Sequence, residues 1–189
     1  DSNYRIWSAA LMHKSQKVLS GGRDGTVRVW DIQSGKIVQS FREPGGGISS
    51  QVGFLSVSPD DSQILLSSMA GAIELWDLEV GQLIRPFVGR YSGAEFCILS
   101  SDGKTALSNS REVLGMGNLD ELKIWDMKTG QILSSFGRTS TRYTKGFFSS
   151  DGRSILTANN KGLIQLWDSQ TRKVMSEFIG HEGGVSSID

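Results

Sequence analysis

A frame of residues that ends in the dipeptide Trp-Asp recurs four times along this chain, and this repetition constrains the fold more than any other feature. The tryptophans of the four pairs are Trp30, Trp76, Trp125 and Trp167. They stand 46, 49 and 42 residues apart, and an apolar segment with a hydroxyl residue precedes each one. A period of about 40 to 50 residues is typical of folds that stack one small unit several times. The chain is therefore expected to be an array of four similar units.

The residues before each tryptophan alternate between apolar and polar. Val27 and Val29 flank Arg28 in the first repeat, and the same alternation recurs before the other three tryptophans. A period of two indicates a β-strand with one buried face. No stretch shows the apolar spacing of three and four residues that a helix requires. We therefore predict an all-β fold, a β-propeller in which each repeat forms one four-stranded antiparallel blade.

The segment LSGGRDGTVRVWD, residues 19–31, resembles the signature of the WD-repeat β-propeller family. The resemblance extends over nearly the whole chain, because four repeats follow one another in register. It implies rigid blades whose usual role is to hold other proteins together, with no chemistry of their own.

The resemblance also implies a hydrogen-bonded network in each blade, made of a His, a Ser or Thr, an Asp and the Trp. A buried indole N–H or hydroxyl must find a partner, which gives such a network its physical purpose. The matching positions are Ser20, Asp24 and Trp30 in the first blade, Ser67 and Trp76 in the second, Ser108 and Trp125 in the third, Thr157 and Trp167 in the fourth, and His181 in a fifth. Lys161 takes the Asp position of the fourth blade and Arg90 the His position of the third. No blade therefore holds all four members of the network.

The repeats together form a single propeller region, residues 1–189. The expected blades span residues 1–43, 44–89, 90–138 and 139–180, and residues 181–189 begin a fifth. WD-repeat propellers usually close with seven or so blades, so we expect an arc of a larger ring. The alternative is a four-bladed ring that this chain closes alone. An open arc is expected to expose strand edges at both ends, which closure normally removes.

Composition and charge exclude several classes of protein. The 189 residues include 20 basic and 20 acidic side chains, a balance that argues against a dedicated nucleic-acid domain. No run of apolar residues is long enough for a membrane helix. The single cysteine, Cys97, excludes an intrachain disulfide, lies in an apolar strand, and is expected to be a buried, inert thiol in a cytoplasmic protein. His13 and His181 fall at opposite ends of their blades, so we predict no metal site and no cofactor.

Basic residues gather at one end of the predicted blades. The resemblance places the turns between the second and third strands on the same face as the connections between blades. The basic residues there are Arg42, Arg90 and Arg138 from the connections, and Arg23, Arg111 and Lys161 from the turns. The acidic residues Asp24, Glu43, Glu112 and Asp120 leave the face only mildly basic. It is either a solvated rim or a site for an acidic partner.

The third blade has an unusually long segment between its second and third strands. This predicted loop runs from Asn109 to Asp120 and carries the apolar residues Val113, Leu114 and Met116. Apolar side chains on a loop rimmed by Arg111 fit a partner-binding site. The alternative is an insertion without function, because loops vary freely.

The predicted function is a non-catalytic scaffold for protein–protein interaction. The partners are expected to be other proteins, with no nucleic acid and no membrane. One alternative is the sensor or regulatory region of a larger enzyme, such as a kinase or a nucleotide-driven switch protein. Another is a propeller that is itself an enzyme, which would need His, Asp or Glu side chains clustered along its central channel.

Overall fold

The predicted all-β propeller is confirmed by a computed structural model, which describes residues 5–42, 51–68, 72–87, 94–112, 119–181 and 183–185. Within these residues the chain forms sixteen strands in four antiparallel sheets, each of four strands in sequence order. We call the strands of a blade a, b, c and d in chain order.

The bounds of the strands are as follows. The first blade contains β1 (Ile6–Leu11), β2 (Lys17–Gly22), β3 (Thr26–Asp31) and β4 (Ile37–Arg42). The second contains β5 (Val52–Val57), β6 (Gln63–Ser68), β7 (Ile73–Asp77) and β8 (Gln82–Phe87). The third contains β9 (Cys97–Leu99), β10 (Thr105–Glu112), β11 (Leu119–Asp126) and β12 (Ile132–Thr139). The fourth contains β13 (Tyr143–Phe148), β14 (Ser154–Asn159), β15 (Ile164–Asp168) and β16 (Val174–Phe178).

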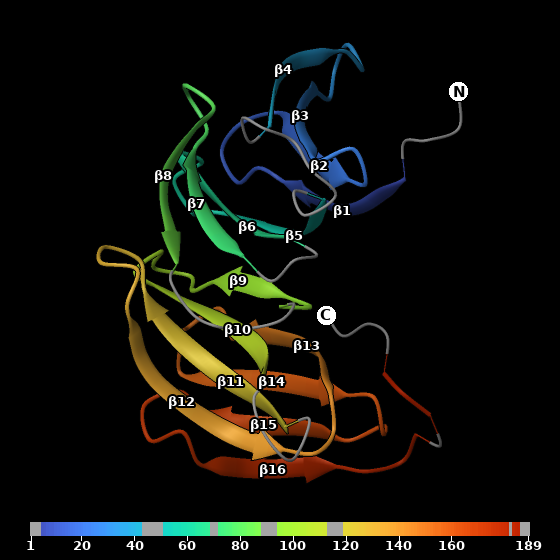
Figure 1. The fold of residues 1–189 in the computed structure, drawn as a ribbon, viewed down its shortest axis with the longest axis vertical. Helices are drawn as coiled ribbons and strands as arrows, with labels where there is room; N and C mark the ends of the chain where they lie inside the picture. The colour runs from blue at the N-terminus through green and yellow to red at the C-terminus, as the bar shows by residue number, and fades with distance from the viewer. Residues whose placement is uncertain are drawn as a thin grey trace.

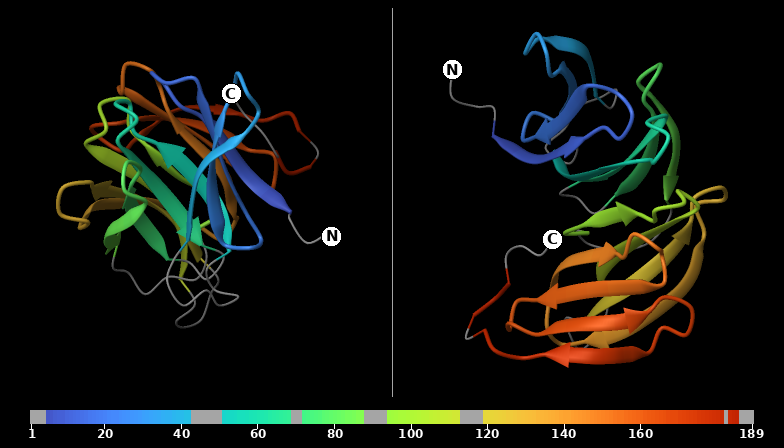
Figure 2. Two further views of the ribbon diagram at one scale, coloured as in Figure 1. Left: turned by 90° about the horizontal axis from the view of Figure 1, so that it is seen from above. Right: turned by 180° about the vertical axis from the view of Figure 1, so that it is seen from behind.

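The four blades follow one another around an arc. The first and fourth blades lie at its two ends, and both further views agree with this arrangement (Figures 1 and 2). The a strands occupy the inner side, where β5 contacts both β1 and β9, and β9 contacts β13. Each d strand is the other edge of its sheet and lies on the outer rim.

The core lies between the blades, in three apolar clusters that each join two neighbouring blades. In every cluster the Phe of strand d in one blade packs against the Trp of strand c in the next. The ring centroids are 5.6 Å apart for Phe41 and Trp76, 5.6 Å for Phe87 and Trp125, and 5.3 Å for Phe136 and Trp167. The recurring Trp and Phe are therefore the two halves of one repeated contact between blades.

The indole N–H of the Trp binds a hydroxyl group on strand b in three of the four blades. It donates to Ser20 in the first blade at 2.8 Å, to Ser108 in the third at 2.9 Å and to Thr157 in the fourth at 2.9 Å. In the second blade Trp76 donates instead to a carboxylate oxygen of Glu74, at 2.9 Å.

Strand register explains why Ser67 is not the partner of Trp76. Ser20 lies opposite Arg28 on strand c, whereas the residue opposite Glu74 is Leu66, so Ser67 stands one position further along its strand. A shift of one residue turns a side chain to the other face of a sheet. Ser67 accordingly faces the buried thiol of Cys97 in the third blade.

The a–b turns of blades two to four repeat one Ser-x-Asp arrangement. In each turn the Ser hydroxyl donates to the Asp carboxylate at 2.6 or 2.7 Å. The pairs are Ser58 with Asp60, Ser100 with Asp102, and Ser149 with Asp151. Hydrogen bonds from the hydroxyls of Ser58 and Ser62, and from the Ser62 N–H, lower the pKa of Asp60 to about 2.

The lowered carboxyl pKa predicts how stability depends on pH. Asp60 is a stronger acid in the folded chain than at its ordinary value of 3.8, so it stabilises the fold when it is ionised. This contribution is complete above its unfolded pKa and is lost as the pH falls through its folded pKa. We expect the free energy of unfolding to fall between about pH 4 and pH 2. Urea unfolding at several pH values measures this, and Asp60→Asn should show a smaller fall; an identical fall in the variant would contradict the assignment.

Candidate interaction surface

The antiparallel order of each blade brings two kinds of loop to the same end. The b–c turns and the connections from strand d to the next strand a lie at this end, which we call the b–c end. In the fourth blade the two are joined directly, because the Arg142 N–H donates to the side-chain oxygen of Asn160 at 3.0 Å, and the Asn160 N–H donates to the Arg142 carbonyl at 2.9 Å. The a–b and c–d turns occupy the opposite end, which we call the a–b end.

The structure describes part of the set proposed from sequence for partner binding. Arg138 near the end of β12 and Lys161 in the β14–β15 turn are both exposed at the b–c end. Arg111 lies on β10, where its backbone pairs with Asp120. The remaining members lie outside the described residues; they are Arg90, Val113, Leu114 and Met116.

The predicted loop from Asn109 to Asp120 is wrong at both its ends. β10 continues to Glu112 and β11 begins at Leu119, so the extra residues lengthen a hairpin. Asn109 and Asp120 are 1% and 2% exposed, and Asp120 is therefore no part of a solvated charged rim. Their burial follows from packing of this longer sheet against the fourth blade.

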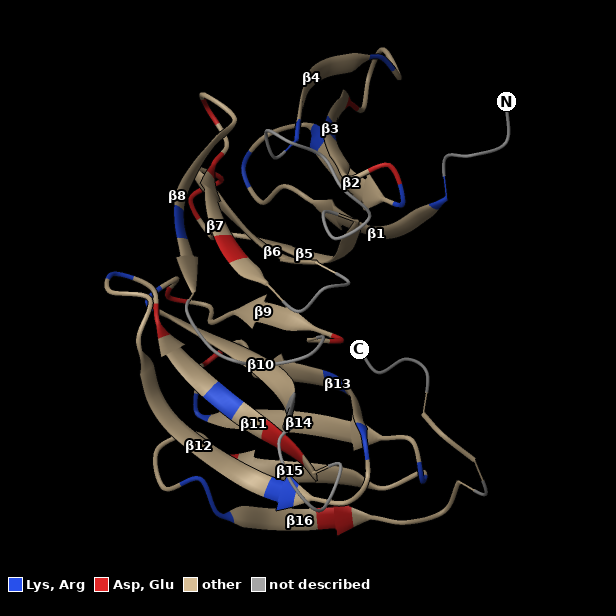
Figure 3. Ribbon diagram, viewed as in Figure 1, with Lys and Arg blue, Asp and Glu red and all other residues tan. Residues whose placement is uncertain are grey.

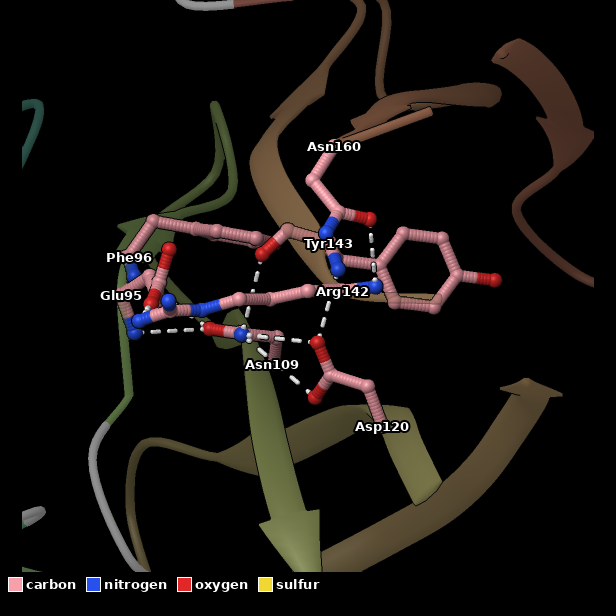
Figure 4. Close-up of polar contacts among 7 residues, drawn as sticks. All are labelled: Glu95, Phe96, Asn109, Asp120, Arg142, Tyr143 and Asn160. Atoms are coloured by element: carbon pink, nitrogen blue, oxygen red, sulfur yellow. Dashed lines mark hydrogen bonds and ion pairs between the residues drawn. The ribbon is translucent and has the colours of Figure 1, made fainter. Parts of the chain in front are cut away.

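Asn109 and Asp120 form a buried polar cluster between the third and fourth blades (Figure 4). The Asn109 amide nitrogen donates to Asp120 at 3.2 Å and to the Tyr143 carbonyl at 3.2 Å. Asp120 also accepts the Tyr143 N–H at 2.7 Å, and the Asn109 side-chain oxygen accepts the Glu95 N–H at 2.8 Å. The cluster thereby fixes the chain entering β9 and the chain entering β13, which are two connections of the b–c end.

An ion pair lies over this cluster and links the same two connections. Arg142, just before β13, pairs with Glu95, just before β9. The Arg142 side chain is 54% exposed and that of Glu95 is 23% exposed, so solvent weakens the attraction. The Tyr143 hydroxyl donates to the Gly137 carbonyl at 2.7 Å. Burial, and then the nearby charge of Asp120, raise the pKa of Tyr143, which keeps its phenol protonated.

Charge is distributed over the blades without a strong excess of one sign. Lys and Arg are interspersed with Asp and Glu on all four blades (Figure 3). In the first blade Asp24 binds Arg28 at 2.6 Å within the b–c end. Burial acts to raise the Asp24 pKa, but its hydrogen bonds to Arg28 and Thr26 outweigh that effect and the pKa is lowered. Asp24 thus supports its own turn and is only 23% exposed.

The single thiol and the two imidazoles occupy positions that give them no shared site. Cys97 is fully buried, and burial raises its pKa to about 12, so it is not a nucleophile at neutral pH. His13 is exposed in the β1–β2 turn at the a–b end, and His181 is exposed beyond β16. Within the described ranges, no three His, Cys, Asp or Glu side chains gather as metal ligands, and no helix is long and apolar enough to cross a membrane.

The burial of Asp120 could be predicted from the sequence pattern, but the unusual length of this segment favoured the interpretation of a loop. Asp120, Leu122 and Ile124 alternate with the neighbouring residues and are all buried. A period of two starting at an acidic residue indicates that the residue shares the buried face of the strand. The partners Glu95, Arg142 and Asn160 show no such pattern, because their contacts depend on how the two blades meet.

The sequence of this chain is similar to one family profile and to several known proteins. The family profile of the WD domain, G-beta repeat (WD40), matches residues 1–31. The chain is 25% identical to Autophagy-related protein 16 of Arabidopsis thaliana over 96% of this chain and 33% of the relative. It is 24% identical to Pre-mRNA-processing factor 19 homolog 2 of the same plant, over 97% of this chain and 34% of the relative. It is 23% identical to the human Angio-associated migratory cell protein, over 93% and 42%. The chain spans about a third of the length of the first two of these relatives.

Proposed function

Because this chain belongs to the WD-repeat β-propeller family, we propose that it is a non-catalytic scaffold that binds other proteins at the b–c end of its blades. Names of similar proteins refer to autophagy and to pre-mRNA processing. The shared feature of these relatives is the repeat, and a role in assembly is the function that a repeat without its own chemistry supports best.

The observation that carries the proposal is the buried cluster under the b–c end. Asn109 on β10 and Asp120 on β11 bind the connections that enter β9 and β13, through hydrogen bonds of 2.7 to 3.2 Å. A surface fixed in this way loses little conformational freedom on binding, which favours affinity. The scaffold therefore offers preorganised loops to a partner.

The exposed charges on these loops favour a partner with an acidic segment. Arg138 and Lys161 are exposed at the b–c end of the third and fourth blades, and Arg142 is half exposed between them in sequence. Glu95 offsets part of this charge through its pair with Arg142. Rim charges of this kind speed association and favour partners of opposite sign more than they add affinity.

A role as the sensor region of a larger enzyme is the second candidate. It is favoured by the length of the relatives, of which this chain spans only 33% to 42% in the three comparisons above. In that case the same b–c end would contact another domain, and catalysis would lie elsewhere.

The test is affinity capture from a cell extract with a matched pair of charge-reversal variants. Arg138→Glu with Lys161→Glu should lose at least one partner that the unchanged chain retains. Lys14→Glu with Lys104→Glu makes the same charge change with exposed residues of the a–b end, and should retain every partner. The captured complex should also weaken as salt is raised. Equal capture by both double variants would contradict binding at the b–c end.

A further inference from the structure

Exposure alternates from residue to residue along the connection from β12 to β13. Arg138, Ser140 and Arg142 are exposed, whereas Thr139 and Thr141 between them are partly buried. Residues two positions apart have Cα atoms no more than about 7 Å apart, whatever the backbone does between them. The connection therefore presents one serine to solvent with an arginine close to it on either side.

The two threonines beside this serine hold the connection together. The Thr139 hydroxyl lies 3.0 Å from that of Thr141 and accepts the Thr141 N–H at 3.2 Å. The Thr141 hydroxyl also accepts the side-chain amide of Asn159 at 3.1 Å. Among the described residues, none forms a hydrogen bond with the Ser140 hydroxyl. Of three successive hydroxyl groups, that of Ser140 is the one open to a reagent in solvent.

The Arg142 side chain can change its partner without disturbing the connection. The Arg142 backbone is held by Asn160, through hydrogen bonds of 3.0 and 2.9 Å, and the next N–H, of Tyr143, donates to Asp120 at 2.7 Å. The guanidinium, by contrast, pairs with Glu95 and is 54% exposed (Figure 4). A group with more negative charge than one carboxylate will therefore compete with Glu95 for it.

We propose that Ser140 is a phosphorylation site for a Ser/Thr kinase that recognises basic residues on both sides of its target, and that the phosphate then binds Arg142. In the transfer, the Ser140 Oγ attacks the γ-phosphorus of ATP. A new O–P bond forms, the bond between that phosphorus and the β–γ bridging oxygen breaks, and ADP leaves. A carboxylate of the kinase accepts the hydroxyl proton. Arg138 and Arg142 supply the positive charge that complements such a kinase.

The phosphate changes the charge of the b–c end. Phosphoserine carries a charge of about −1.5 to −2 at pH 7. Arginine binds phosphate through two parallel hydrogen bonds, so the Arg142 guanidinium leaves Glu95 for the phosphate, and the Glu95 carboxylate loses its partner. The effect on binding rests on the function proposed above, in which an acidic partner binds this end. Phosphorylation then repels that partner and acts as a switch that releases it.

Treatment of the full chain with ATP and a purified kinase of this basic preference tests the modification. Mass spectrometry of the resulting peptides should place the phosphate on Ser140. Ser140→Ala should abolish incorporation, and Arg138→Gln should slow it several-fold. Ser110 is the internal control, because it precedes Arg111 but is 3% exposed and should stay unmodified. Incorporation that survives Ser140→Ala, or phosphate on other hydroxyl groups while Ser140 stays unmodified, would overturn the site.

Phosphorus NMR of the phosphorylated chain tests where the phosphate binds. The second pKa of phosphoserine is about 6, and a neighbouring cation lowers it because the cation favours the dianion. We expect a lowered pKa in the unchanged chain, a still lower one in Glu95→Gln, where Arg142 has lost its competing partner, and a higher one in Arg142→Gln. Equal phosphate pKa values in the three chains would show that the phosphate does not bind Arg142.

Capture from a cell extract separates this inference from the proposed function. The phosphorylated chain should lose the same partner as the double variant Arg138→Glu with Lys161→Glu, and kinase-treated Ser140→Ala should retain it. A phosphorylated chain that keeps this partner would overturn the switch and leave the proposed function standing. If the double variant loses no partner, the proposed function fails instead, while mass spectrometry and the phosphate pKa still decide the site at Ser140.

Discussion

Replacing Asp120 with alanine is expected to lower the free energy of unfolding by about 3 kcal/mol, since two buried donors then lose their acceptor. The backbone N–H of Tyr143 and the amide of Asn109 both donate to this carboxylate, and both residues are 2% exposed or less. Each unsatisfied buried group costs about 1 to 3 kcal/mol. The loss should fall mainly on the contact between the third and fourth blades.

Urea unfolding at pH 7 measures the effect of Asp120→Ala. Asp120→Asn should lose less, because one oxygen remains to accept the Tyr143 N–H. Glu79→Ala is the control, since Glu79 is an exposed acidic residue in a c–d turn and its loss should change little. Equal midpoints for Asp120→Ala and the control would show that the buried cluster does not stabilise the fold.

Phe87→Ala is expected to lower the free energy of unfolding by about 3 to 5 kcal/mol, the usual cost of removing a buried aromatic side chain. Phe87 is 5% exposed and its ring lies 5.6 Å from that of Trp125 in the next blade. Its removal leaves a cavity between two blades. Because hydrogen bonds between the strands hold the backbone of each sheet in place, the surrounding side chains fill this cavity only in part.

Leu83→Ala on the same strand is the matched comparison for Phe87→Ala. Leu83 is 41% exposed and should cost less than about 1 kcal/mol. Thermal and urea unfolding of the two variants give the difference directly. If both variants lost the same amount, the contact between Phe and Trp across the junction would carry no special weight.

The blades could be predicted from sequence because their signal is local. Alternation before each Trp fixes strand c, and its spacing fixes the repeat, whatever the neighbouring blade does. The hydroxyl partner of Trp76 could not be assigned in this way. Leu66 and Ser67 both fit an apolar-Ser segment, and only the pairing of Leu66 with Glu74 identifies which residue takes the position of Ser20.

The candidate surface was predictable only in outline. The placing of Arg138 and Lys161 at one end of the blades follows from antiparallel order, which repeat spacing already implies. The burial of Asp120 depends on the continuation of β10 and β11 and on the position of Tyr143, which belongs to another blade. The exposure of strand edges at the two ends of the arc stays a prediction, because each described blade has two edge strands wherever it lies in the array.

The arrangement of blades side by side makes this molecule a nearly one-dimensional array. The buried residues of each apolar cluster come from two adjacent blades, and Phe54 of the second blade packs in addition against the cluster between the third and fourth. In such arrays stability is a sum of local terms and nearest-neighbour terms. Loss of packing in one cluster therefore weakens most the two blades that share it, and the other blades keep their own contacts.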